Sequence, residues 1–313
     1  MSLEQLPHGQ MPEFHEEECE HAFYQAKWPT GFRCPRCGCS AYYRISSRGR
    51  RLFECRSCAH QTSLTAGTIL EGTRTPLVKW FQALFLMQIG ISAKLLAERI
   101  LVTYKTAWLI NHKLRHAIQV LDEASPLAGD LQVYGNFYAG PTTSWPSDPL
   151  APQEQPVIVG ASSDPDTGEL TAVKIKRMPA AGFARRVFDL ESIGGFVWRH
   201  AADAKSRTRN IEVVKVNDGF GVTELGGIWR GVIRWLARTF GGIGPKHLQA
   251  YLDEYCFRLN VRADAQETLL SLCGSTNTIT QPELVGKDRH VRPIRWTGIA
   301  GRRKPRLRGA EVC

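Results

Sequence analysis

Two pairs of cysteines are the residues of this chain with the clearest capacity for chemistry. Cys34 and Cys37 form one CxxC pair, Cys55 and Cys58 form another, and residues 38–54 separate the pairs. Each CxxC turn brings two thiolates together, and two such turns complete the tetrahedron that Zn²⁺ prefers. A module this small has little core of its own and needs the metal to fold. The spacing therefore predicts a structural zinc ribbon, with a redox dithiol as the alternative.

The composition favours a polyanionic partner. Forty Lys and Arg residues against thirty Asp and Glu residues give the 313-residue chain a formal charge of +10, and such proteins attract phosphates through counterion release. The sequence has no run of eighteen apolar residues, and its first residues are polar and acidic, unlike a signal peptide. We expect no membrane partner and a cytoplasmic protein. The length predicts two or three domains.

Three helices with short connections are predicted after the cysteine pairs, over residues 76–89, 92–100 and 104–120. Apolar residues recur at helical spacing in each segment. Ser92 and Thr103 precede the second and third helices and can cap them. This arrangement fits a helix-turn-helix domain over residues 74–122.

The third predicted helix has an apolar stripe and several polar residues beside it. The stripe expected to be buried is Ala107, Ile110, Leu114 and Ile118. The residues beside it that could contact phosphates or base edges of DNA are Tyr104, Lys105, Lys113, Arg115 and His116. The alternative interpretation is an ordinary helical bundle with a solvated basic face.

Strand-like and helical segments alternate after residue 124, which predicts an α/β fold with a mixed sheet and flanking helices. The predicted strands lie near residues 131–140, 156–163, 169–178 and 211–217, and the predicted helices lie near residues 183–192, 226–240 and 246–262. A basic tail over residues 286–313 is expected to be disordered until it binds DNA. Its candidate DNA contacts are Arg302, Arg303, Lys304 and Arg306.

Two long blocks carry a family resemblance. The run that begins CPRCG at Cys34 and continues through FECRSCAHQTSLTAGTILEG to HKLRHAI at Ile118 resembles the amino-terminal half of ISXO-like bacterial insertion-sequence transposases. The run IWRGVIRWLARTFGGIGPKHLQAYLDEYCFRLNVR, residues 228–262, is similar to the last catalytic helix of that family and the helix after it.

The resemblance implies the domain organisation and the partner. It implies a zinc ribbon at 32–66 with residues 1–31 packed on it, the helix-turn-helix, and an RNase H-like DDE domain at 128–275. The implied partner is double-stranded DNA in the bacterial nucleoid, with the chain acting as a monomer or a homo-oligomer.

The same resemblance implies a damaged nuclease site. In such domains three acidic side chains, or two Asp and one Asn, hold two divalent ions that activate the attacking oxygen. Here Tyr134, His200 and Gly226 stand where the family's three metal ligands belong. A neutral phenol is a poor Mg²⁺ ligand because that ion prefers hard, anionic oxygen. The candidate replacement carboxylates are Asp203 and Glu224, each displaced by a few positions.

Three functions follow as alternatives. The first is a transposase-derived DNA-binding protein that does not cleave DNA and serves as a regulator, an architectural factor or a degenerate element product. The second is an active Mg²⁺-dependent transposase in which Asp130, Asp203 and Glu224 form the triad after local shifts. The third is an adaptor whose zinc ribbon binds another protein. Other acidic residues, Asp164, Asp166, Asp253 and Glu254, are interpreted as turn formers or solvated helix charges.

Overall fold

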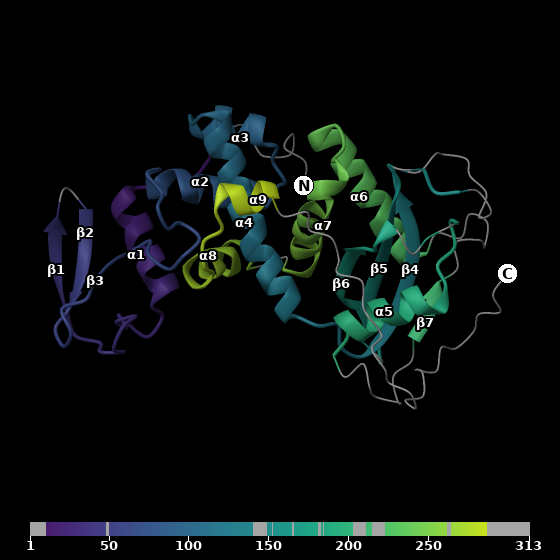
Figure 1. The fold of residues 1–313 in the computed structure, drawn as a ribbon, viewed down its shortest axis with the longest axis horizontal. Coiled ribbons are helices and arrows are strands. Elements are labelled where there is room, and N and C mark those ends of the chain that lie inside the picture. The colour runs from purple at the N-terminus through teal and green to yellow at the C-terminus, as the bar shows by residue number, and fades with distance from the viewer. Residues whose placement is uncertain are drawn as a thin grey trace. The chain divides into compact units, whose positions relative to one another are not determined.

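The chain divides into two compact units in a computed structural model (Figure 1). The first unit contains the residues up to Leu121 together with Val261–Gly286, and the second contains Asp122–Asn260. The structure describes the following residues: 11–47, 50–139, 149–151, 153–164, 166–180, 183, 185–202, 211–214, 223–261 and 264–286.

A three-stranded antiparallel sheet and one helix form the beginning of the first unit. The sheet has the order β1 (Tyr42–Ser47), β2 (Arg50–Cys55) and β3 (Gln61–Ser63). Helix α1 (Glu16–Lys27) precedes it and was not expected from the sequence. The rings of Trp28 and Phe53 lie 5.1 Å apart and continue into a cluster of aromatic side chains. Burial of these rings supplies the apolar core that the small sheet otherwise lacks.

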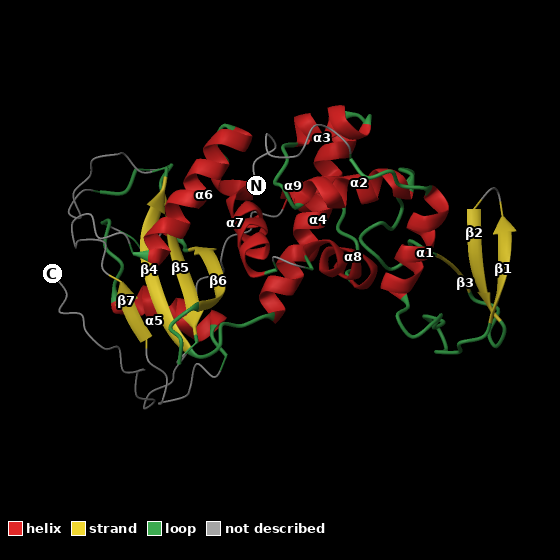
Figure 2. Ribbon diagram, turned by 180° about the vertical axis from the view of Figure 1, so that it is seen from behind, coloured by secondary structure: helices red, strands yellow, loops and turns green. Residues whose placement is uncertain are grey.

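Three helices follow the small sheet: α2 (Leu77–Met87), α3 (Ala93–Ile100) and α4 (Tyr104–Ala124) (Figure 2). The predicted caps are confirmed. Ser92 Oγ accepts a hydrogen bond from the N–H of Leu95 at 3.3 Å, and Thr103 Oγ1 accepts one from the N–H of Thr106 at 3.2 Å. The predicted apolar stripe of α4 is also confirmed, because each of its four side chains is at most 1% exposed.

Two carboxy-terminal helices, α8 (Ala265–Ser275) and α9 (Gln281–Gly286), also belong to the first unit. The predicted boundary of the α/β domain at residue 275 is therefore wrong, because the second unit ends at Asn260. Gly274 explains the close packing of α8 on α1. A Cβ atom at this position would lie 2.8 Å from backbone atoms of Ala26 and Lys27, so only glycine permits this approach.

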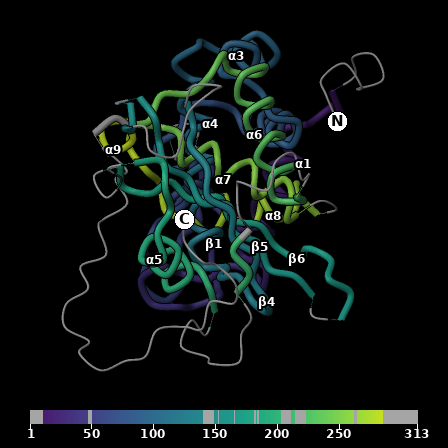
Figure 3. The backbone as a smooth tube through the Cα atoms, turned by 90° about the vertical axis from the view of Figure 1, so that its right-hand side faces the viewer, coloured from purple at the N-terminus to yellow at the C-terminus, as the bar shows by residue number. Residues whose placement is uncertain are grey.

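The second unit contains a four-stranded mixed sheet in the order β6-β5-β4-β7. Strands β4 (Asp130–Tyr138), β5 (Gln155–Ser163) and β6 (Leu170–Arg177), which Figure 3 labels, pair antiparallel. Strand β7 (Ile211–Val214) pairs parallel with β4. The three strands predicted around Val133, Val157 and Val173 thus share one sheet, as expected.

Helices cover both faces of this sheet. Helix α5 (Leu190–His200) packs on one face through Phe196. Helices α6 (Glu224–Phe240) and α7 (Pro245–Asn260) pack on the other through residues such as Val232 and Leu252. The helix predicted near residues 183–192 is thus displaced, because the Asp189 carboxylate accepts a hydrogen bond from the N–H of Ser192 and starts the helix at Leu190.

Two amide side chains of α7 cover the outer edge of β6. Gln249 accepts a hydrogen bond from the N–H of Arg177 at 2.8 Å and donates one to the carbonyl of Ile175 at 3.0 Å. Asn260 forms the same reciprocal pair with the N–H and C=O groups of Val173, both at 2.9 Å. Each amide therefore substitutes for one residue of a neighbouring strand.

None of the helices in the described residues combines the length and apolar character that crossing a membrane requires.

Candidate metal centre and nucleic-acid interface

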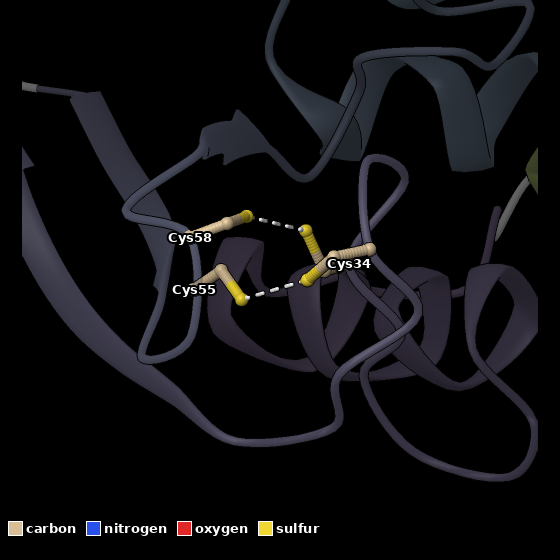
Figure 4. Close-up of side chains that lie close together, drawn as sticks. Cys34, Cys55 and Cys58 are labelled. Atoms are coloured by element: carbon tan, nitrogen blue, oxygen red, sulfur yellow. Dashed lines mark hydrogen bonds between the residues drawn. The ribbon is translucent and has the colours of Figure 1, made fainter.

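The four predicted zinc ligands converge at one point. The Sγ atoms of Cys34 and Cys58 lie 3.7 Å apart, and those of Cys37 and Cys55 lie 3.5 Å apart (Figure 4). All four sulfur atoms lie within 4.8 Å of one another. A tetrahedral zinc with Zn–S bonds of about 2.3 Å holds its sulfurs about 3.8 Å apart. The cluster is therefore compatible with one structural Zn²⁺.

The two CxxC turns have the same backbone design. The N–H of Gly38 donates to the carbonyl of Cys34 at 2.9 Å, and the N–H of Ala59 donates to that of Cys55 at 3.0 Å. Gly38 and Ala59 occupy equivalent positions, and both have a positive φ, 74° and 53°. Glycine adopts this left-handed conformation without penalty, whereas alanine is strained in it.

Backbone N–H groups in these turns point at the first sulfur of each pair. Burial opposes ionisation of Cys34, but the N–H groups of Cys37 and Arg36 lower the pKa of its thiol. Burial likewise opposes ionisation of Cys55, while the N–H groups that follow it lower the pKa of that thiol to about 6. A zinc ligand must be a thiolate, so these N–H groups favour the metal-binding form at the first cysteine of each pair. At the second cysteine of each pair, hydrogen bonds with the neighbouring thiols raise the pKa instead, to about 12 for Cys37.

The remaining cysteines in the described part of the chain lie outside the cluster. Cys39 is partly exposed, and its sulfur lies near the carbonyl of Ala41 rather than near the four ligands. Cys19, Cys256 and Cys273 are buried, as expected for small apolar residues. The cluster that is compatible with zinc thus consists of the four residues that the spacing indicates.

Comparison with known proteins supports the same interpretation. Residues 15–61 match the family model described as a transposase zinc-ribbon domain, of the IS1595 type. A protein of Halobacterium salinarum, described as an uncharacterized protein in transposable element ISH50, is 27% identical over 126 residues. The matched segments are therefore similar to parts of transposase-related proteins. The similar region covers 39% of the chain and 42% of the halobacterial protein, and no solved structure matches.

The amino-terminal turn of the candidate recognition helix is exposed. Tyr104 is 57% exposed, and Lys105 is exposed beside it. Lys113 and Arg115, which were expected on the exposed face, are instead buried at 7% and 1% exposure, and His116 is half-buried.

The expectation for Lys113 and Arg115 is wrong because the middle of α4 is enclosed on all sides. Lys113 Nζ donates hydrogen bonds to the carbonyl of Ile69 at 2.7 Å and to Thr278 Oγ1 at 2.9 Å. Burial lowers the pKa of this amine. Lys113 therefore joins a loop before α2 to the segment before α9. The four tail candidates, Arg302, Arg303, Lys304 and Arg306, lie outside the described residues.

The three positions aligned with nuclease ligands hold groups that serve other purposes. Tyr134 lies within β4, packs against the core beneath α6 and α7, and accepts a hydrogen bond from Asn136 at 2.8 Å. His200 ends α5, and burial together with two nearby lysines lowers its pKa to about 3. Gly226 donates its N–H to Thr223 Oγ1 at 3.2 Å, and a Cβ atom there would lie 2.9 Å from that oxygen.

Of the three carboxylates proposed for a working triad, Asp130 and Glu224 lie in the described part of the chain. Asp130 begins β4, four residues before Tyr134, which is about 13 Å along a strand. Glu224 is exposed at the first residue of α6, and Asp203 lies outside the described residues. Among the residues described, the four cysteines are the one group of three or more Cys, His, Asp or Glu ligand atoms close enough to hold a metal.

A buried ion network in the second unit was not expected from the sequence. Lys176 Nζ lies 2.5 Å from a carboxylate oxygen of Asp122 and 2.7 Å from one of Asp253, and Lys174 Nζ lies 2.9 Å from Asp122. Asp253 and Glu254 were interpreted as solvated helix charges, which is wrong, because they are 1% and 0% exposed. The lysine that pairs with Asp253 lies 77 residues away in the sequence, so helical position alone gave no signal.

Asp164 was interpreted correctly as a turn former. Its carboxylate accepts hydrogen bonds from the N–H groups of Asp166 and Thr167, both at 2.9 Å. This arrangement closes the hairpin between β5 and β6.

Proposed function

We propose that this chain binds double-stranded DNA through its zinc ribbon and helix-turn-helix and does not cleave it. The main support for the proposal is the positive charge of the ribbon, the segment that is similar to transposase zinc ribbons. Residues 32–66 contain one acidic residue, Glu54. They also contain seven arginines: Arg33, Arg36, Arg44, Arg48, Arg50, Arg51 and Arg56. More than half of the chain's net charge of +10 therefore lies in this short module.

Aromatic and cationic groups are interleaved on the ribbon surface. The Arg56 guanidinium lies 4.5 Å from the ring centroid of Tyr43, which is 53% exposed. Arg33, Arg36 and Arg44 are also exposed. Guanidinium groups bind phosphates, and a stacked arginine and tyrosine can lie against a sugar or base. This surface suits a nucleic acid better than the protein partner of an adaptor.

The strand order supports an RNase H-like second unit of the ISXO-like type. Three antiparallel strands in chain order are followed by a helix and by β7, which returns parallel to the first of them, β4. In this interpretation the middle of β4 would carry the first metal ligand, and Tyr134 stands there. His200, which is half-buried and neutral, and Gly226 stand at the other two aligned positions. The unit would therefore retain the fold as a scaffold without two-metal catalysis.

Binding is tested with the zinc-loaded full chain by fluorescence anisotropy on mixed-sequence duplexes at several salt concentrations. We expect affinity to fall as a power of salt concentration, with a slope of about −0.9 for each phosphate contacted. Absence of binding to every duplex, combined with specific capture of one cellular protein, would favour the adaptor.

A map of chromosomal binding sites assigns the biological role. Occupancy of a few promoters indicates a regulator, occupancy of element ends indicates transposition, and broad coverage indicates an architectural protein of the nucleoid. The active transposase, which requires Mg²⁺ and Asp203, is the competing function.

A further inference from the structure

The turn between α3 and α4 carries a leucine whose conformation and exposure are both unfavourable. Leu101 has φ 54° and ψ 56°, in the left-handed region, where its Cβ is crowded by its own backbone. It is also 81% exposed, the highest exposure among the large apolar side chains of the described residues. Glycine or asparagine relieves the strain at such a position, and any polar residue suits the solvent better.

The end of α3 does not itself require a leucine here. The N–H of Leu101 donates to the carbonyl of Ala97, and the N–H of Val102 donates to the same oxygen at 3.1 Å. Val102 is half-buried and stands where an apolar residue usually accompanies such a helix end. The isobutyl group of Leu101 therefore has no identified use within the fold.

The surroundings of Leu101 suit a DNA groove. Residues 93–106 hold three cations, Lys94, Arg99 and Lys105, and one acid, Glu98. Tyr104 and Lys105 are exposed in the first turn of α4, and the amino-terminal end of that helix carries partial positive charge. In helix-turn-helix proteins the recognition helix, which corresponds to α4 here, contacts base edges in the major groove with its amino-terminal end.

We propose that Leu101 contacts the C5-methyl group of a thymine and so contributes sequence preference. This inference rests on the proposed DNA binding. The methyl group of thymine is the one apolar group that a standard base pair presents in the major groove, so an exposed leucine at this end of α4 has a single complementary target there. Lys105 and the other nearby cations would hold phosphates, which carry no sequence information.

The test begins by selecting bound duplexes from a random library with the zinc-loaded full chain. Each thymine of the selected site is then replaced by uracil, which removes the methyl group and keeps every hydrogen-bonding atom. Wild type should lose about fourfold in affinity at one or two positions, the worth of one buried methyl group. Leu101→Gly, which relieves the backbone strain, should bind the thymine and uracil duplexes equally.

Two matched variants separate the outcomes. Lys105→Ala should bind more weakly to both duplexes and keep the fourfold ratio, whereas Leu101→Met should keep the ratio and the affinity. A ratio that persists in Leu101→Gly, or a wild type insensitive to uracil at every position, overturns the proposal while leaving DNA binding intact. No enriched duplex at all contradicts the proposed function instead. Loss of self-association in Leu101→Gly with an unchanged ratio would assign the residue to a contact between copies.

Discussion

Each cysteine of the zinc set is expected to be indispensable, and the chain provides its own control. Cys55→Ala should release stoichiometric zinc and unfold residues 32–66, because zinc binding contributes on the order of 10 kcal/mol to folding in modules of this kind. Cys39→Ala should do neither, since its sulfur lies outside the cluster. Elemental analysis with near-ultraviolet circular dichroism measures both effects. Full zinc content in Cys55→Ala would contradict the assigned ligand set.

His200 should make folding sensitive to pH. Its pKa is about 3 in the native protein and 6.5 ordinarily, so below pH 6.5 the unfolded chain binds a proton that the native chain does not. The free energy of unfolding should therefore fall as pH decreases from about 6.5 to about 3, with this residue contributing at most about 1.4 kcal/mol per pH unit.

The comparison that isolates this contribution is His200→Gln, which stays neutral throughout. Urea unfolding of both proteins at several pH values should show a smaller pH slope in the variant, with the difference vanishing above pH 7. Equal slopes would show that the native imidazole accepts a proton normally.

Residue chemistry was predictable where the partners are close in sequence. The zinc ligands follow from two short motifs, and the caps at Ser92 and Thr103 follow from their places before apolar runs. The surroundings of Lys113 were not predictable, because its hydrogen-bond partners Ile69 and Thr278 lie 44 and 165 residues away. A helical pattern distinguishes one buried face but does not show when the opposite face is buried as well.

At the scale of elements, the two CxxC turns differ at one equivalent position. Ala59→Gly should stabilise the ribbon by about 0.5–1 kcal/mol, because glycine relieves the left-handed strain that alanine bears at φ 53°. Gly38→Ala should destabilise the first turn by a similar amount. Thermal unfolding of the zinc-loaded protein and competition with a zinc chelator measure both changes. A loss of stability in Ala59→Gly would show that the alanine methyl group makes a contact worth more than the strain.

Substitutions at two positions of helix α4 should separate an effect on stability from an effect on DNA affinity. Lys113→Met removes a buried ammonium that donates to a carbonyl and a hydroxyl, so we expect a loss of about 1–3 kcal/mol in stability and unchanged DNA affinity of the folded fraction. Lys105→Ala, in the exposed first turn, should lower affinity and leave stability unchanged. Denaturation and anisotropy on the same samples test both. An equal loss of DNA affinity in Lys113→Met and Lys105→Ala would show that Lys113 contacts DNA.

Elements with strong local signals were predicted, and elements defined by distant packing were not. The strands β4, β5 and β6 and the helices α6 and α7 lie where their patterns indicate. Helix α8 was assigned to the wrong unit, because its position depends on the contact of Gly274 with α1, whose sequence lies about 250 residues earlier. No local pattern carries that information.

At the scale of the whole molecule, recognition should survive without cleavage. The zinc-loaded chain should bind an uncut duplex with the same affinity in Mg²⁺, in Mn²⁺ and without divalent ions, and should give no nicked or joined product. Asp203→Ala and Glu224→Ala should leave affinity unchanged, because neither side chain would hold metal or phosphate. Metal-dependent nicking that Asp203→Ala abolishes would establish the active transposase.

The amides of Gln249 and Asn260 have a consequence for how copies of this protein can assemble. The unpaired N–H and C=O groups of an open sheet edge can pair with a strand of another chain and so lead to aggregation. Natural proteins protect such edges against this pairing. Along Val173–Arg177 the N–H and C=O groups of Val173, the C=O group of Ile175 and the N–H group of Arg177 already form hydrogen bonds with side chains of α7. Before another strand could pair with the outer edge of β6, α7 would have to separate from the sheet. That separation would expose the buried charge of Asp253. Any self-association that accompanies DNA binding therefore has to use side-chain surfaces or another edge.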